Sequence, residues 1–261
     1  MRILHVGDIV GSPGRNAFQR IAIPMKQEGL VDAIIVNAEN SAAGRGITPS
    51  IAETLLNAGA DVITLGDHTW DQKDIYSFLD LEPRIIRPLN FAPGCPGRGW
   101  TTLETPGGSF TVISIIGRVF MNPYDCPFRA IDALLRQHAD FPPVIMVEIH
   151  AEATSEKIAI GRYLDGRVSS VVGTHTHVQT SDETILPKGT AYLTDLGMTG
   201  PKDSVLGRDL PTILSKFLNG MPVKFEVAKD LVALEGAIIE IDPRGRATSI
   251  TRVREILPPA G

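Results

Sequence analysis

Short apolar runs, each ended by Gly, Asn or His, recur along the first two thirds of the chain. They lie at residues 2–7, 33–37, 61–65, 110–116, 143–149 and 168–172. Uninterrupted apolar runs of this length are typical of strands that are buried on both faces. Segments with helical periodicity separate several of them, at residues 14–28, 49–58, 71–80, 127–138 and 154–164. This alternation predicts an α/β fold.

The pattern changes after residue 185. Strand-like pieces follow there without well-formed helices between them, at residues 190–194, 223–227, 232–241 and 247–255. We therefore expect a second, more antiparallel sheet. Two sheets packed face to face with helices outside predict a four-layer α/β/β/α sandwich, and functional sites in open α/β sheets gather at the carboxyl ends of strands.

Composition and charge narrow the classes of protein that remain. The 261 residues are 43% hydrophobic and 21% charged, and no linker or low-complexity segment divides them, so residues 1–261 are expected to form a single domain. The net charge is −5, with acidic and basic residues interleaved. A dedicated nucleic-acid binder would carry a basic patch, so RNA could enter only as a substrate.

The chain opens on a strand-like segment, without the pattern of a secretion signal. Its apolar runs are far shorter than the roughly 20 residues that a membrane helix needs. The two cysteines, Cys95 and Cys126, form no CxxC pair, which fits a reducing compartment. We expect a soluble cytoplasmic protein with no membrane partner, and the sequence leaves homo-oligomerisation open.

Acidic side chains follow three of the predicted strands. Asp8 comes directly after the first, Glu39 with Asn40 after the second, and Asp67 after the third. Each one alone could equally cap a helix or bind backbone amides. Together they predict a carboxylate cluster at one edge of the sheet.

Histidines at strand ends strengthen this interpretation. His68 follows Asp67, His150 ends an apolar strand, and His175 and His177 end another. Residues i and i+2 of an extended segment point the same way, so we expect His175 and His177 to face one cavity. Four histidines matched to three carboxylates indicate a shared site. His5, inside the first strand, and His138, at a helix end, are interpreted as structural.

Clustered carboxylates repel one another, and their pKa values rise unless cations compensate the charge. Two metal ions about 3.5 Å apart would provide this compensation. Mixed oxygen and imidazole ligands without thiolate favour iron or manganese, with zinc as the alternative, over magnesium or calcium.

Motifs from residue 7 to about residue 207 resemble the bacterial YmdB-type metallophosphoesterases, and the resemblance covers most of the chain. It implies a calcineurin-like fold and hydrolysis of small cyclic nucleotides, 2′,3′-cyclic nucleotides or 3′,5′-cyclic AMP. The motifs are GDIVGSPGR, NAENSAAGRGIT, LGDHTWD, NPYDCPF, EIHAEATSEK, GTHTHVQTSDE and YLTDLGMTGPKDSVLG.

The resemblance also implies a role for each residue. One metal ion would be held by Asp8, Glu39, Asn40 and His177, and the other by Glu39, Asp67, His150 and His175. A hydroxide bridging the two metals would attack phosphorus, and His68 would protonate the leaving oxygen as general acid.

The chain departs from the family pattern at two positions. Asp67 stands in the family's Gly-Asn-His motif where Asn is usual, and Cys126 replaces an Asn in the Pro-Tyr-Asp loop. Val10 stands where many broader metallophosphoesterases carry the histidine of a DxH motif. The YmdB-type subfamily shares this substitution. The extra carboxylate at position 67 adds negative charge and puts metal preference and activity in question.

Two other functions are alternatives to the phosphodiesterase. A regulator that binds metal and nucleotide, turns over slowly or not at all, and acts through a partner would need the ligands but no free acid such as His68. A Rossmann-like nucleotide binder would use Gly7, Gly11 and Gly14, but their spacing is not GxGxxG. Retention of His68 beside a complete ligand set favours the phosphodiesterase.

Overall fold

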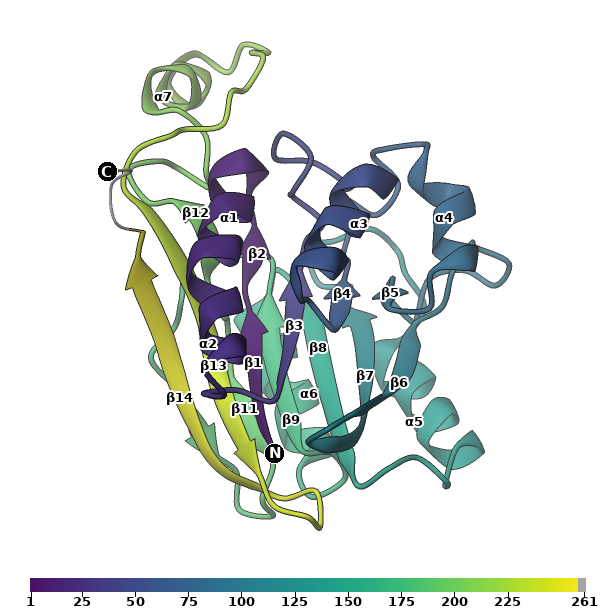
Figure 1. Ribbon diagram of the computed structural model, residues 1–261. Coiled ribbons are helices and arrows are strands. Elements are labelled where there is room, and N and C mark those ends of the chain that lie inside the picture. Colours follow the sequence, from purple (N-terminus) through teal and green to yellow (C-terminus); the bar gives the residue numbers. More distant parts are fainter. Residues whose placement is uncertain (258–261) are drawn as a thin grey trace.

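The computed structural model describes residues 1–257, which form two sheets packed face to face (Figure 1). The first sheet runs in the order β2 (Asp8–Ile9), β12 (Met198–Pro201), β13 (Val232–Ile241), β1 (Arg2–Val6), β3 (Ala33–Asn37), β4 (Val62–Thr64) and β5 (Ile85–Ile86), and β14 (Ala247–Ile256) pairs with β13. The second runs in the order β10 (Thr184–Ile185), β11 (Ala191–Leu193), β9 (Ser170–Thr174), β8 (Val144–His150), β7 (Gly108–Ile116) and β6 (Trp100–Thr105).

Helices cover both outer faces of the sheet pair (Figure 1). The first sheet is covered by α1 (Gly11–Ala17), a π-helical turn η1 (Phe18–Ala22), α2 (Ile23–Gln27), α3 (Pro49–Ala58) and α4 (Ile75–Leu81). The second is covered by α5 (Pro127–Gln137) and α6 (Thr154–Leu164), while α7 (Leu210–Asn219) projects beside the sheets. This arrangement confirms the predicted four-layer α/β/β/α sandwich.

The central strands are apolar on both faces because each face meets a different core. In β3, Ile34 and Val36 pack toward the helices, whereas Ala33 and Ile35 pack toward the second sheet. A third core fills the space between the second sheet and its helices, with Val147 of β8 among its members. Burial on both sides produces the uninterrupted apolar runs seen in the sequence.

Parallel pairing places the strand ends that carry the site together. Strands β1, β3, β4 and β5 are parallel in the first sheet, as are β7, β8, β9 and β11 in the second. Their carboxyl ends therefore meet at one edge of the sandwich, the upper edge in Figure 1. Every predicted site residue lies at or just beyond one of these ends.

The prediction that the last strands of the chain form a separate, antiparallel second sheet is wrong. Strands β13 and β14 extend the first sheet beside β1, and the second sheet is built from β7, β8 and β9 of the middle of the chain. Residues 223–227 do not form a strand; only Val227 makes an isolated bridge, with Arg208. Apolar patterning shows that a segment is extended, but its hydrogen-bonding partner is decided by distant residues.

The helix α7 was not predicted, although its sequence carries ordinary signals at both ends. The Asp209 side chain accepts a hydrogen bond from Thr212 N at 3.1 Å, and Gly220 ends the helix in the left-handed conformation with φ 71°. These are the side-chain N-cap and the glycine C-cap of a regular helix. No helix within residues 1–257 is long and apolar enough to cross a membrane.

Candidate metal centre

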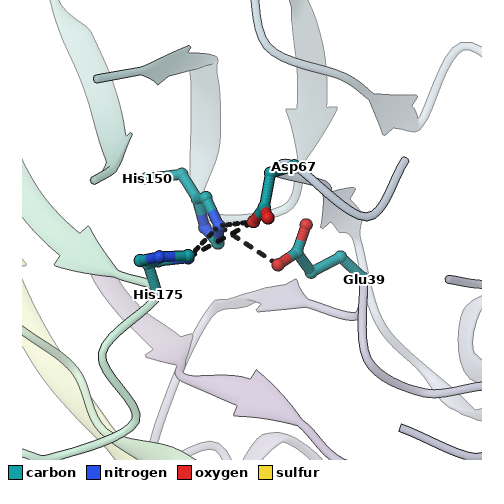
Figure 2. Close-up of side chains that lie close together, drawn as sticks. All are labelled: Glu39, Asp67, His150 and His175. Carbon is teal, nitrogen blue, oxygen red and sulfur yellow. Dashed lines mark hydrogen bonds and ion pairs between the residues drawn. The ribbon is translucent and has the colours of Figure 1, made fainter. Parts of the chain in front are cut away.

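Four side chains from both sheets converge at the carboxyl edge of the sandwich. One ligand atom from each of Glu39, Asp67, His150 and His175 lies within 4.8 Å of the others. Figure 2 shows the two carboxylates and the two imidazoles pointing toward one another. His150 Nε2 lies 2.8 Å from Asp67 Oδ1 and 3.1 Å from Glu39 Oε1. The strand ends that the sequence singled out thus supply one compact cluster.

His150 is held with one ring nitrogen aimed at the carboxylates. It is the last residue of β8 and is fully buried. Its Nδ1 lies 2.9 Å from Thr174 Oγ1, and Thr174 Oγ1 in turn donates to the buried Glu148 carboxylate at 3.2 Å. A metal-binding imidazole commonly has its second nitrogen fixed in this way.

The Glu148 carboxylate lies between the sheets beneath the cluster. It accepts hydrogen bonds from Asn37 Nδ2 at 2.7 Å and Thr64 Oγ1 at 2.6 Å, and His5 Nε2 lies 2.8 Å from it. His5 is fully buried, which agrees with its interpretation as a structural residue. The network ties β1, β3, β4 and β8 together directly below the site.

Asp8, Asn40 and His177 lie beside the cluster with ligand atoms that have no hydrogen-bond partner. Among the described residues, Asp8 Oδ1, Asn40 Oδ1 and His177 Nδ1 are all buried and unsatisfied, and His177 Nε2 lies 3.9 Å from Asp8 Oδ1. Buried polar atoms without a partner are costly unless a ligand binds them. Oxygen and nitrogen donors of this kind suit a transition-metal ion, so the residues present fit a metal centre.

The protonation states of the metal-free cluster reflect its crowded charges. Burial raises the pKa of Asp8 well above its ordinary value. Burial by itself lowers the pKa of His150, but the charge of Glu39 and the hydrogen bond to Asp67 raise it well above 6.5. Burial, together with the charge of His175, lowers the pKa of His177 to about 3. A proton on His150 therefore supplies counter-charge when no cation does.

The loop that carries His175 and His177 is not extended, so the predicted geometric reason for their alignment is wrong. Their φ angles are 98° and 61°. Between them, Thr176 donates to Asp195 Oδ2 from its backbone N at 3.2 Å and from Oγ1 at 2.7 Å. Lys157 Nζ donates to the same oxygen at 2.7 Å, and Lys157 and Asp195 are both fully buried. This ion pair holds the loop in an unusual backbone conformation.

Asp195 was missed in the sequence, although it stands just beyond β11 in the manner of the predicted ligands. Glu152 was missed as well; its Oε2 lies 3.2 Å from His175 Nε2, and the side chain is half-exposed. The signal for Glu152 was its place two residues after His150. An acidic residue close to a ligand in sequence does not by itself reveal which way its side chain turns.

His68 lies next to the cluster but is not a member of it. Its backbone N donates to Glu39 Oε2 at 2.9 Å, and its Nδ1 lies 2.9 Å from Asp71 Oδ2. The imidazole is a quarter exposed and lines a cavity of about 650 Å³ at the cluster. Asp71 fixes the ring by its Nδ1, which leaves Nε2 free to meet a ligand in the cavity.

The four-layer sandwich, with this cluster at its carboxyl edge, has the fold of the calcineurin-like metallophosphoesterases. The family model described as YmdB-like protein matches residues 4–253, so the chain belongs to that family. It is 48% identical over 254 residues to the 2′,3′-cyclic-nucleotide 2′-phosphodiesterase of Bacillus subtilis, covering 97% of this chain and 96% of that protein.

Two solved structures superpose on nearly the whole chain. A hypothetical protein from Thermus thermophilus gives a TM-score of 0.93 at 42% identity, with 99% of this chain and 100% of that chain covered. A novel phosphatase from Mycoplasma pneumoniae gives 0.91 at 32% identity, with 98% and 93% covered. The resemblance drawn from the motifs is therefore confirmed.

Proposed function

We propose that this protein is a dinuclear-metal phosphodiesterase that hydrolyses small cyclic nucleotides, 2′,3′-cyclic nucleotides or 3′,5′-cyclic AMP. The observation that carries the proposal is the convergence of Glu39, Asp67, His150 and His175 within 4.8 Å. The activity of the similar Bacillus subtilis protein supports a 2′,3′-cyclic substrate. Hydrolysis of the P–O2′ bond would then yield a nucleoside 3′-monophosphate.

We assign the ligands to two overlapping sets. We place Glu39 in both, as the resemblance to the family implies. Its Oε1 lies 3.1 Å from His150 Nε2, and its Oε2 accepts a hydrogen bond from the backbone N of His68. Bound iron or manganese ions, or zinc, would supply Lewis acidity toward the phosphoryl group and an activated water nucleophile. The first set is Asp8, Glu39, Asn40 and His177, and the second is Glu39, Asp67, His150 and His175.

His68 is assigned to proton donation. With Nδ1 held by Asp71 at 2.9 Å, the imidazolium can present Nε2–H to the oxygen that leaves phosphorus. The hydrogen bond from the backbone N of His68 to Glu39 Oε2 keeps the imidazole next to the cluster, although the ring itself is not a ligand. A histidine suits this role because its charge changes near neutral pH.

The test begins with metal-free protein reconstituted anaerobically with manganese or iron. Elemental analysis should give two equivalents per chain, and one equivalent or less would contradict the proposal. The loaded protein should convert 2′,3′-cyclic AMP to the 3′-monophosphate, with 3′,5′-cyclic AMP assayed in parallel. Binding of metal and nucleotide without turnover would instead support the regulator.

The free thiols of Cys95 and Cys126 fit a cytoplasmic location.

A further inference from the structure

The cavity at the metal centre has two unlike walls. One carries the polar residues Glu39, His68 and His175. The apolar part of the lining, here called the α7 wall, comes from α7 and its flanking segments and consists of Leu206, Ile213, Phe217 and Phe225. A phosphodiester group needs only the polar wall, since its oxygens bind cations and hydrogen-bond donors. The α7 wall therefore indicates that the ligand has an apolar part as well.

Two cations connect the α7 wall to the rest of the site. The Arg208 guanidinium lies 5.6 Å and Lys216 Nζ lies 4.9 Å from the centre of the Phe225 ring. Arg208 also donates to the backbone carbonyl of Gly44 at 2.7 Å, which joins the α7 wall to the loop after β3. These contacts fix Phe225 as part of the wall and place two positive charges in the cavity lining, where an anionic ligand would be attracted.

Phe217 differs from Phe225 in having an open ring. It lines the cavity and is 75% exposed. Within residues 1–257, no aromatic ring or cation stacks on it. A large aromatic face open to a cavity with positive charge nearby is a suitable platform for a planar ring attached to a phosphate.

We propose that Phe217 stacks on the nucleobase of the substrate while the phosphate lies at the metal centre. The inference rests on the proposed function and names the group that recognises the nucleoside. Every base has a π-face, so stacking of this kind tolerates all four bases. The site should therefore distinguish nucleotides from base-free phosphodiesters more strongly than it distinguishes one base from another.

A different occupant would be a second copy of the chain, because Leu218 of α7 and Met221, just after the helix, are also exposed. Leu218 provides a matched control. It is adjacent to Phe217 on α7 and is 86% exposed, yet it does not line the cavity. A nucleobase platform requires Phe217 alone, whereas a protein interface would involve both residues.

The experiment uses the metal-loaded full chain with 2′,3′-cyclic AMP and with base-free methyl riboside 2′,3′-cyclic phosphate. Phe217→Ala should lower kcat/KM for the nucleotide by about tenfold or more, mainly through KM, as expected for a lost base–aromatic stack. The base-free substrate should be unaffected, Phe217→Trp should retain nucleotide activity, and Leu218→Ala should behave as the wild type. An equal loss on both substrates, or no loss on either, would overturn the proposal.

Two further measurements separate this inference from the function on which it rests. Calorimetric binding of adenosine 3′-monophosphate should weaken in Phe217→Ala even if the wild type shows no turnover, in which case only the proposed function fails. Sedimentation should give the same oligomeric state for wild type, Phe217→Ala and Leu218→Ala. A common change in association in both variants, with joint loss of activity, would show an interface and refute the platform.

Discussion

The metal centre and the α7 wall line one cavity but are built in opposite ways. Glu39, His150 and Asp195 are almost fully buried and tied into the sheets by hydrogen bonds and ion pairs. Phe217 and Leu218 lie on a projecting helix and are largely exposed. Metal ligands need fixed geometry, which requires a packed surrounding, whereas a stacking surface needs only a flat apolar face. Substitutions should therefore damage the two sides differently.

The largest expected effect is on catalysis at the border between the two regions. His68→Ala should lower kcat by about 10²- to 10⁴-fold, because it removes the proton donor. Both metals should remain, since His68 is not assigned as a ligand. His138→Ala is the control, because that ring stacks on Phe141 at the end of α5. Loss of metal in His68→Ala would contradict the assigned role. The loss of activity should also be smaller for aryl phosphodiesters, whose good leaving groups need less protonation, and an equally large loss on these substrates would contradict the role as well.

Lys157→Met should be the most destabilising of the changes considered. It leaves the buried Asp195 carboxylate without its counter-charge, which typically costs about 3–5 kcal/mol, and weakens the hold on the His175–Thr176–His177 loop. Urea unfolding of the metal-free protein measures the cost. The control is Lys26→Met, which breaks the partly exposed pair with Asp61 at 2.6 Å and should cost roughly 1 kcal/mol. Equal losses of unfolding free energy in the two variants would show that the buried pair contributes no more to stability than the partly exposed one.

Metal affinity should rise with pH around neutrality. The charge of Glu39 and the bond to Asp67 outweigh burial and raise the pKa of His150 well above 6.5, so in the metal-free protein this ring is protonated at pH 7. Binding must displace that proton, which makes affinity increase by about tenfold per pH unit until the raised pKa is passed. Calorimetry in buffers of different ionisation enthalpy should detect proton release. Proton uptake or a pH-independent affinity would contradict this account.

Replacing Asp67 by Asn should have a smaller effect on metal affinity and hydrolysis. Burial favours its neutral form, but the hydrogen bonds to His150 and His175 dominate and lower its pKa below the usual range. Against four charges from two divalent ions, the carboxylates of Asp8, Glu39 and Asp67 leave a net charge of about +1, whereas Asn at 67 leaves about +2. Asp67→Asn should bind metal less tightly yet hydrolyse phosphodiesters at least as fast, with a lower pH optimum. Metal titration and a pH–rate profile test this; normal metal binding with tenfold slower turnover would defeat the charge explanation.

The smallest effect is expected on the stability of the α7 wall. Phe217→Ala and Leu218→Ala should each change the free energy of unfolding by no more than about 0.5 kcal/mol, because both side chains are already exposed. Leu55→Ala in the core under α3 is the contrasting variant, since Leu55 is fully buried, and should cost about 2–5 kcal/mol. A large loss for Phe217→Ala would mean that α7 packs more tightly in solution, and the comparison between the two regions would not hold.

Local physical chemistry was enough to predict much of the fold and the residues of the candidate site. Helix α3 has the predicted bounds because Thr48 caps its start and Gly59 ends it with φ 130°. Helix α6 and strand β13 also have the predicted bounds. Polar residues at the ends of apolar strands marked the cluster, since strand burial and chain direction can both be inferred from the pattern. The sequence also carries the cap signals of α7, Asp209 at its start and Gly220 at its end.

Only the tertiary structure decided how these pieces combine. The pairing of β1 with β13 brings Ile3 beside Ile239, 236 positions away in sequence. The hydrogen bond from Thr176 to Asp195 joins residues 19 positions apart. The left-handed backbone of His175 and His177 replaced the extended geometry expected from their spacing. Phe217 shares a cavity with the metal centre only because the chain between β12 and β13 brings α7 to that cavity. Periodicity and capping depend on near neighbours, whereas sheet partners, buried ion pairs and cavity walls depend on burial and charge contributed by distant parts of the chain.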